Sequence, residues 1–287
     1  MSRERDVGKW LSELPQKCPY IIEHYNVSPM EGKFIHFAME HYDDGDLFEY
    51  INDLREAGIQ LEEDEIKRIF RQMATAIKFL HDRNVAHRDV KPENFVIKKS
   101  DKISPDGIEL IDHVKLIDFG HTISFEPGQI FTECLGTPGY RGPEMHEPYY
   151  SHQTSNAVHY FHNSKPMLKR PRNVAVHCKY QAPPLDIYSL GISLYMLLEN
   201  CFPPQTQSGR IKRLVFVSDH YRYGRILSSG ARNLIRDMLH ADPTKRLTID
   251  QVLAHEWFVS NFRVCKNIQW FIHHEIQFEF SQNIYHN

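Results

Sequence analysis

Three polar side chains with different chemical capacities lie close together in one short segment: the carboxylate of Asp89, the ammonium of Lys91 and the carboxamide of Asn94. Apolar residues flank the segment on both sides, which indicates that it is held against a hydrophobic core. Polar groups in such a place must be hydrogen bonded or functional. A carboxylate is ionised at neutral pH and only accepts hydrogen bonds, so Asp89 could take up a proton in a reaction. A second candidate carboxylate, Asp118, follows an apolar pair and precedes the turn residue Gly120.

Helical periodicity predicts the elements that hold these residues in place. Over residues 62–81, apolar side chains recur at intervals of three and four, which predicts an amphipathic helix leading into the Asp89 segment. Acidic residues at its start favour the helix dipole. A second helix, over residues 186–199, carries apolar side chains around most of its circumference and is therefore expected to be buried.

Shorter elements are predicted around these two helices. Two strands joined by a turn-rich link are expected at 21–27 and 34–39, and a long hairpin turn at 99–113. Further helices are predicted over 3–14, 231–240 and from Thr248 through Trp257. Thr248 and Gln251 have the spacing of a capping box at the start of the last helix.

Length and composition are those of an ordinary globular protein. The chain has 287 residues, of which 41% are hydrophobic and 25% are charged, enough for one or two domains with an ample core. The net charge of −3 gives no general attraction to nucleic acid or to an anionic membrane. We find no apolar run of about 18 residues and no signal peptide. We therefore expect neither nucleic acid nor a membrane as a partner, and a cytoplasmic or nuclear location.

The cysteine pattern also favours a cytoplasmic or nuclear location. The five cysteines are scattered, odd in number and include no Cys-x-x-Cys pair: Cys18, Cys134, Cys178, Cys201 and Cys265. This pattern predicts free thiols in a reducing environment rather than a disulfide framework.

The polar residues and their order resemble a known family. His87-Arg88-Asp89 with Lys91 and Asn94, followed by Asp118-Phe119-Gly120, resembles the catalytic and metal-binding loops of eukaryotic serine/threonine protein kinases. Gly142-Pro143-Glu144 is similar to the Ala-Pro-Glu motif of that family, with Gly142 in place of alanine. We call residues 87–94 the catalytic loop and residues 121–140 the activation loop.

The resemblance covers about Arg3 to Phe258 and implies an α+β fold of the protein-kinase type, with a mainly helical large lobe and a truncated small β lobe. Segments starting at Gly45 and Asp242 are similar to the calcium/calmodulin-dependent group. By resemblance, residues 1–40 are a remnant of the small lobe, residues 41–258 are the large lobe and residues 259–287 are a C-terminal tail. Residues 146–180 form a polar insertion without clean periodicity, which we expect to be a surface loop or disordered.

The resemblance implies ATP-dependent phosphorylation of serine or threonine in a protein substrate. Asp89 would accept the proton of the substrate hydroxyl, and Lys91 would neutralise charge on the transferred phosphoryl group. Asn94 and Asp118 would hold Mg²⁺ through hard oxygen ligands. Thr137 would contact Asp89 and Lys91 and help to accept the substrate.

An ATP site is implied beside these residues. Its predicted members are Met39, Glu40, Tyr42, Asp46, Glu93 and Val96. Backbone groups of residues such as Glu40 and Tyr42 would hold the adenine, with Met39 behind it and Val96 beneath it. An acidic side chain at the Asp46 position takes the ribose hydroxyls in this family, and Glu93 would lie near the ribose and the substrate.

Several structural contacts are also implied by the resemblance. His87 is expected to pack with Phe119, and the Asp186 carboxylate to accept hydrogen bonds from the catalytic-loop backbone. Arg246 is expected to pair with Glu144.

The activation loop carries a glutamate at the position that is usually phosphorylated in the family. Our hypothesis is that Glu133, with Thr132 beside it, replaces the phosphate and pairs with Arg88 as a weaker single charge. The alternative is that Glu133 is a solvated loop residue.

The largest departure from the family pattern lies before Glu40. No Gly-x-Gly-x-x-Gly sequence and no strand lysine for the phosphates occur there. The helix glutamate that pairs with that lysine is not assigned either, with Glu4, Asp6 and Glu13 as candidates. Two alternatives to an active enzyme therefore stay open: a catalytically impaired pseudokinase or binding module, and a fragment of an active kinase. The sequence predicts no oligomeric state.

Overall fold

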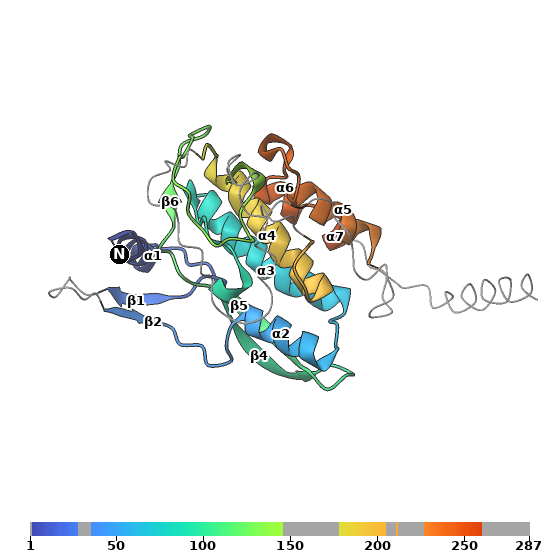
Figure 1. The fold of residues 1–287 in the computed structure, drawn as a ribbon. Helices are drawn as coiled ribbons and strands as arrows, with labels where there is room; N and C mark the ends of the chain where they lie inside the picture. The colour runs from blue at the N-terminus through green and yellow to red at the C-terminus, as the bar shows by residue number, and fades with distance from the viewer. Residues whose placement is uncertain (1, 28–35, 146–177, 205–210, 212–226, 260–287) are drawn as a thin grey trace, which may run out of the picture.

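The computed structural model describes residues 2–27, 36–145, 178–204, 211 and 227–259 (Figure 1). Most of the predicted insertion at 146–180 and nearly all of the tail at 259–287 lie outside the described residues. The rest forms the expected α+β architecture, in which helices dominate and the sheets are small.

The small lobe consists of one helix and one pair of strands, on the left in Figure 1. Helix α1 (Ser2–Glu13) is followed by β1 (His24–Val27) and β2 (Phe37–Met39), which pair in antiparallel fashion. The helix and both strands confirm the prediction, although the strands are shorter than expected. Residues 20–22 instead join the large lobe, because the Ile22 N–H donates to the Leu116 carbonyl oxygen at 3.0 Å.

Two long helices form the centre of the large lobe (Figure 1). Helix α3 (Glu63–His81) follows α2 (Leu47–Ala57) and buries its apolar face, as its periodicity predicts. Helix α4 (Ala182–Glu199) is buried almost all around. Gly191 allows α4 to approach α5 closely, because a Cβ there would lie 3.0 Å from the Cβ of Met238 and 2.9 Å from Leu239.

Shorter helices complete the large lobe on its far side. These are α5 (Ser229–Met238), α6 (Ile249–Leu253) and α7 (Glu256–Val259), with the 3₁₀ turns η2 (Pro143–Met145) and η5 (Pro243–Lys245). Thr248 and Gln251 form the predicted capping box. The predicted ion pair is also present, since Arg246 Nη1 and Nη2 donate to the two carboxylate oxygens of Glu144, each at 2.6 Å.

A long hairpin brings the candidate metal ligands to one end of the lobe. The 3₁₀ turn η1 (Pro92–Asn94) leads into β4 (Phe95–Ile103), which pairs with β5 (Glu109–Leu116), as the predicted hairpin requires. In an antiparallel pair the start of one strand lies beside the end of the other. Asn94 precedes β4 and Asp118 follows β5, and the Ile117 N–H donates to the Asn94 carbonyl oxygen at 2.9 Å.

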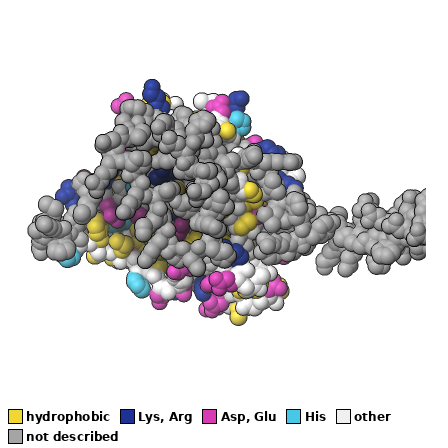
Figure 2. All heavy atoms as spheres, viewed as in Figure 1, with side chains coloured by type: hydrophobic (Ala, Val, Ile, Leu, Met, Phe, Trp, Pro, Cys, Tyr) yellow, Lys and Arg dark blue, Asp and Glu magenta, His cyan; other side chains and the backbone are white. Residues whose placement is uncertain are grey.

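The surface of the described residues carries charges of both signs. On the face shown in Figure 2, acidic and basic side chains lie next to one another around the edge of the molecule. Among the described helices, none combines the length and the hydrophobicity needed to cross a bilayer.

Candidate active site

The catalytic loop is held in place by its backbone. It leaves α3 through Asn84, whose φ is 54°, and the short strand β3 (Val85–Ala86), which pairs with β6 (Ile123–Ser124). Arg88 is also left-handed, with a φ of 66°. The buried carboxylate of Asp186 accepts hydrogen bonds from the His87 and Arg88 N–H groups at 2.9 and 2.7 Å. The contact predicted for Asp186 is therefore confirmed, and it offsets the strain of the turn.

His87 is a neutral packing residue in this structure. Its Nδ1 accepts from the Asp89 N–H at 3.3 Å, and its Nε2 lies 3.2 Å from the Ile117 carbonyl oxygen, which can only accept. Burial lowers the pKa of His87. Its ring packs edge-on against Phe119 at 5.6 Å, as predicted. His87 therefore fixes the relative positions of the catalytic and metal-binding loops.

The carboxylate of Asp89 stands at the centre of a compact polar cluster. Its Oδ1 accepts hydrogen bonds from the backbone N–H and the hydroxyl of Thr137 at 2.7 and 2.8 Å. Lys91 Nζ lies 3.0 Å from Oδ2 and donates to the Thr137 hydroxyl at 2.8 Å. The contacts predicted between Thr137, Asp89 and Lys91 are thus present, and they bridge a separation of 48 residues.

This cluster keeps Asp89 ionised. Burial alone raises the pKa of its carboxyl, but the hydrogen bonds from Thr137 and the ion pair with Lys91 outweigh burial and lower the pKa below its ordinary value. Asp89 is only 6% exposed. The result is a fixed, largely desolvated carboxylate whose charge is present throughout the neutral pH range.

Asn94 and Asp118, the predicted metal ligands, each keep a side-chain oxygen that could bind a divalent cation. The Asn94 amide nitrogen donates to the Asp89 carbonyl oxygen at 2.8 Å, so the donor end of this side chain is committed and its oxygen is the end left for a ligand. Asp118 is exposed and has a φ of 59°, a conformation that costs energy for a residue with a Cβ. One carboxylate oxygen accepts from the Gly120 N–H at 3.1 Å. The two oxygen-bearing side chains suit Mg²⁺.

The residues predicted to bind ATP lie along the β4–β5 hairpin. Asp46 and Val96 form an antiparallel bridge. Glu40 accepts from Lys115 Nζ at 2.5 Å, and Tyr42 Oη lies 2.6 Å from Nε2 of a second β5 residue, His113. The structure therefore brings the Glu40–Asp46 segment against one end of the hairpin, and β5 supplies partners that the sequence did not identify.

Some of the predicted ATP-site residues already have intramolecular partners. The carboxylate of Asp46 caps α2, accepting from the Phe48 and Glu49 N–H groups at 2.8 and 2.9 Å. Glu93 accepts from the Tyr140 hydroxyl at 3.0 Å, and burial raises the pKa of both Asp46 and Glu93. Met39, by contrast, is 41% exposed at the end of β2.

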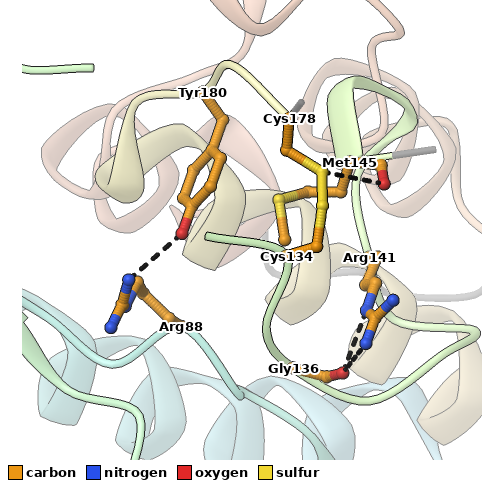
Figure 3. Close-up of a disulfide and its surroundings, with 7 residues drawn as sticks. All are labelled: Arg88, Cys134, Gly136, Arg141, Met145, Cys178 and Tyr180. Atoms are coloured by element: carbon orange, nitrogen blue, oxygen red, sulfur yellow. Dashed lines mark hydrogen bonds between the residues drawn. A yellow bond between two sulfur atoms is a disulfide. The ribbon is translucent and has the colours of Figure 1, made fainter. Parts of the chain in front are cut away.

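The activation loop touches the catalytic loop through a glycine. Gly136 has a φ of 83°, and a Cβ at this residue would lie 2.8 Å from the Arg88 carbonyl oxygen. A side chain is therefore excluded both by the backbone conformation and by the contact. Arg141 Nε donates to the Gly136 carbonyl oxygen at 2.9 Å from the other side (Figure 3).

The predicted pairing of Glu133 with Arg88 is present. Arg88 Nη1 donates to the Glu133 carboxylate at 3.1 Å and to the Tyr180 hydroxyl at 3.1 Å, and its Nε donates to the His121 carbonyl oxygen at 2.7 Å. The hydrogen bonds from Arg88 and Arg3 lower the pKa of Glu133. Glu133 is therefore an ion-paired residue and not a free loop side chain.

The prediction that every cysteine is a free thiol is wrong. Cys134 of the activation loop and Cys178, just before α4, form a disulfide (Figure 3), whereas Cys18 is a free thiol. The two half-cystines are separated by 44 residues. Sequence spacing carries no signal for such a pair, because only the fold brings its members together.

Comparison with known families agrees with this geometry. The family model described as "Protein kinase domain" matches residues 3–165 and 170–258, which is most of the chain. The chain belongs to the protein kinase family. The family that the catalytic-loop residues predict is thereby confirmed, and the matched range ends at the same residue, Phe258, as the predicted resemblance.

Curated relatives of this kinase-family chain come from animals and plants. The SNF-related serine/threonine-protein kinase of Rattus norvegicus is 30% identical over 240 residues, covering 83% of this chain and 26% of that protein. Calcium-dependent protein kinase 6 of Oryza sativa subsp. japonica is 31% identical over 234 residues, covering 79% and 34%. Calcium-dependent protein kinase 10 of Arabidopsis thaliana is 30% identical over 258 residues, covering 86% and 39%. The chain thus spans about a quarter to two-fifths of the length of these relatives.

Helix α1 places one acidic side chain, that of Glu4, near Asp118. Burial, followed by the nearby Asp118 carboxylate, raises the pKa of Glu4. Asp6 instead accepts from Arg5 at 2.8 Å, and Glu13 lies 3.8 Å from Lys9 Nζ. Glu4 therefore lies close enough to Asp118 to interact with its charge, whereas Asp6 and Glu13 pair with basic residues of their own helix.

Proposed function

We propose that this chain catalyses the ATP-dependent phosphorylation of serine or threonine hydroxyls in protein substrates. The observation that carries the proposal is the cluster of Asp89, Lys91 and Thr137, in which an ionised carboxylate and an ammonium group share one hydroxyl. A substrate hydroxyl that takes the place of the Thr137 hydroxyl beside Asp89 would meet a proton acceptor and a positive charge together. Phosphoryl transfer requires this combination of positioning and charge neutralisation.

Asn94 and Asp118 are the residues that would hold Mg²⁺. The cation would supply charge neutralisation for the terminal phosphates of ATP. The fit rests on the chemistry of the two donors: an amide whose nitrogen is already committed to Asp89 and an exposed carboxylate in a left-handed turn.

The adenine of ATP would bind beside the Glu40–Asp46 segment. The Glu40 N–H is taken by the Glu23 carbonyl oxygen at 2.9 Å, so the Glu40 carbonyl oxygen is the backbone group left to accept from the adenine amino group. Val96 would pack beneath the ring and Met39 behind it. Asp46 would receive the ribose hydroxyls through the carboxylate oxygen that does not cap α2.

Two measurements test the proposal in order. At ten times its dissociation constant, Mg²⁺–ATP adds about 1.4 kcal/mol to stability, which raises the melting temperature of a domain of this size by about 3–5 °C. Transfer of the γ-phosphoryl group to serine- and threonine-containing peptides is then measured with the full chain. Asp89→Asn should lower the transfer rate by about 10²–10⁴ while the thermal shift with Mg²⁺–ATP persists. Equal rates in wild type and Asp89→Asn would remove Asp89 from the reaction.

A non-catalytic binding module is the second candidate function. It is favoured by the partners that occupy ATP-site residues: Lys115 on Glu40, the α2 N-terminus on Asp46 and Tyr140 on Glu93. This candidate predicts no thermal shift with millimolar ATP and Mg²⁺. A shift without phosphoryl transfer would instead indicate an incomplete enzyme, as the missing glycine-rich loop and strand lysine suggest.

A further inference from the structure

Two segments that are distant in the sequence, one in the activation loop and one just before α4, lie side by side. The N–H groups of Phe131 and Tyr180 each donate to the carbonyl oxygen of the other residue, at 2.8 and 3.1 Å, and their rings lie 6.0 Å apart. The disulfide between Cys134 and Cys178 joins the same two segments a few residues along (Figure 3). We call this unit, residues 131–134 with 178–180, the loop clamp.

The loop clamp contacts the catalytic loop through one side chain, Arg88. The Arg88 guanidinium is fully buried, and its Nη1 donates to one acceptor from each clamp segment, both at 3.1 Å: Glu133 and the hydroxyl of Tyr180. Figure 3 shows the second of these hydrogen bonds. Glu133 immediately precedes Cys134, so the disulfide limits where Glu133 can lie. Whether Cys134 and Cys178 form a disulfide or two thiols therefore affects the contacts that Arg88 makes with Glu133.

The surroundings of the sulfur atoms accommodate both oxidation states. Cys178 is only 3% exposed, and its Sγ lies 3.5 Å from the Met145 carbonyl oxygen. Once the disulfide is reduced, the Cys178 thiol can donate to that oxygen without a change in position. Cys134 is half-buried, so this residue is more exposed than Cys178. An acceptor is thus already in place for the thiol that reduction releases at Cys178.

We propose that Cys134 and Cys178 form a reversible thiol–disulfide modification site that orders the activation loop. In the oxidised form the loop clamp is covalently closed and Glu133 is held against Arg88. In the reduced form the backbone pairing, the ring contact and the contacts of Arg88 with Glu133 and Tyr180 remain, without the covalent link. Where disulfides form in a reducing compartment, they are usually transient and serve catalysis or redox sensing.

The chemistry of the switch is thiol–disulfide exchange with a small-molecule thiol. The thiolate of one solute molecule attacks Sγ of Cys134, and Cys178 leaves as a thiolate that takes up a proton. A second solute thiolate attacks the solute sulfur of this mixed disulfide and releases Cys134. The protein gains two electrons, and the solute is oxidised to its disulfide. Oxidation of the protein is the reverse reaction, with the same class of disulfide as the oxidant.

Backbone hydrogen exchange of the full chain tests the proposal without reference to catalysis. The chain is equilibrated with oxidised or with reduced glutathione, and peptides from residues 126–141 are followed by mass spectrometry. We expect the loop amides to exchange about fivefold faster or more after reduction. Peptide mapping without reductant should recover Cys134 linked to Cys178 in the oxidised sample.

Single substitutions provide the matched controls. Cys134→Ser and Cys178→Ser should each show the fast loop exchange in both glutathione states, whereas Cys201→Ser should respond to glutathione as the wild type does. The wild-type comparison involves no substitution, so a variant that fails to fold does not decide the result. Recovery of Cys134 and Cys178 as free thiols after oxidation, or equal loop exchange in the two states, overturns the proposal.

A second readout connects the switch to activity, and only this step depends on the proposed function. Reduction should lower the rate of phosphoryl transfer by about fivefold or more, and reoxidation should restore it. Absence of transfer in both states would count against the proposed function, while the exchange experiment would still decide whether the disulfide orders the loop. Faster transfer after reduction would overturn the assignment of the oxidised form as the ordered one.

Discussion

Replacement of Glu133 by alanine tests how the activation loop is held to the catalytic loop. The substitution removes the carboxylate that accepts from Arg88 Nη1 at 3.1 Å and from Arg3 at 3.3 Å. Arg88 is fully buried, and within the described structure its Nη2 has no hydrogen-bond partner. After the substitution, this buried cation would retain only the Tyr180 hydroxyl and the His121 carbonyl oxygen.

The size of the effect follows from the unequal burial of the two partners. Breaking a fully buried ion pair costs about 3–5 kcal/mol, whereas an exposed pair contributes about 0–1 kcal/mol. Glu133 is 48% exposed, so solvent screens the pair and we expect a loss of about 1–2 kcal/mol. The exposed contact with Arg3 adds little. The population of open loop should rise about 5–30-fold.

Hydrogen exchange of the activation loop and thermal unfolding measure this loss. We expect loop amides to exchange faster by the factor above and the melting temperature to fall by about 2–8 °C. Glu126→Ala, an exposed glutamate of the same loop, is the matched control and should behave as the wild type. If Glu133→Ala and Glu126→Ala are indistinguishable at pH 7, the ion pair does not hold the loop.

The pH dependence provides an independent check on the same pair. Because the hydrogen bonds lower the pKa of Glu133 in the folded chain, its stabilisation is fully present above the ordinary value of 4.5. The stabilisation is lost as the pH falls through the lower, folded pKa. The difference between wild type and Glu133→Gln should therefore be constant from about pH 5.5 to 8 and shrink below about pH 4.5. A difference that persists at the lowest pH at which both proteins stay folded would refute the ionic explanation.

Three further perturbations have defined outcomes. Glu144→Ala leaves the fully buried Arg246 guanidinium without its carboxylate, and unfolding free energies from denaturant titration should fall by about 3–5 kcal/mol. Reduction of the disulfide opens a loop of 44 residues, which by the chain-entropy relation lowers the unfolding free energy by about 4 kcal/mol, measured with and without reductant. Thr137→Ala removes the hydroxyl hydrogen bond that lowers the pKa of Asp89 and keeps the backbone one, so the acid limb of kcat/KM against pH should move to higher pH.

The parts of the fold that local sequence determines were predictable. The apolar spacing over 62–81 gives helix α3 within one residue, because an amphipathic face of that length has no competing periodicity. Helix α4 begins at Ala182, before the predicted start at residue 186. Pro183 and Pro184 lie in its first turn, where backbone N–H groups need no intrahelical partner, so they begin the helix and do not exclude it.

Predictions that depend on tertiary contacts are less complete. The strand expected at 21–27 shortens to 24–27 because Ile21 forms a bridge with Leu116 of the large lobe, a partner 95 positions away in the printed sequence. In the predicted ATP site, Lys115 contacts the Glu40 carboxylate and His113 contacts the Tyr42 hydroxyl, and neither contact is suggested by spacing. Periodicity describes one face of one element and cannot identify which other element covers it.

The contacts of Arg88 include one that local sequence predicts and one that depends on the tertiary fold. Glu133 could be predicted because its position relative to the Gly136–Tyr140 motif is local, and the motif itself is held at the catalytic loop by Thr137 and Gly136. Cys178 and Tyr180 stand at the end of the predicted insertion, and no local pattern indicates that the chain returns there to the activation loop. The same guanidinium therefore binds one acceptor that follows from the family pattern and one that only the tertiary fold reveals.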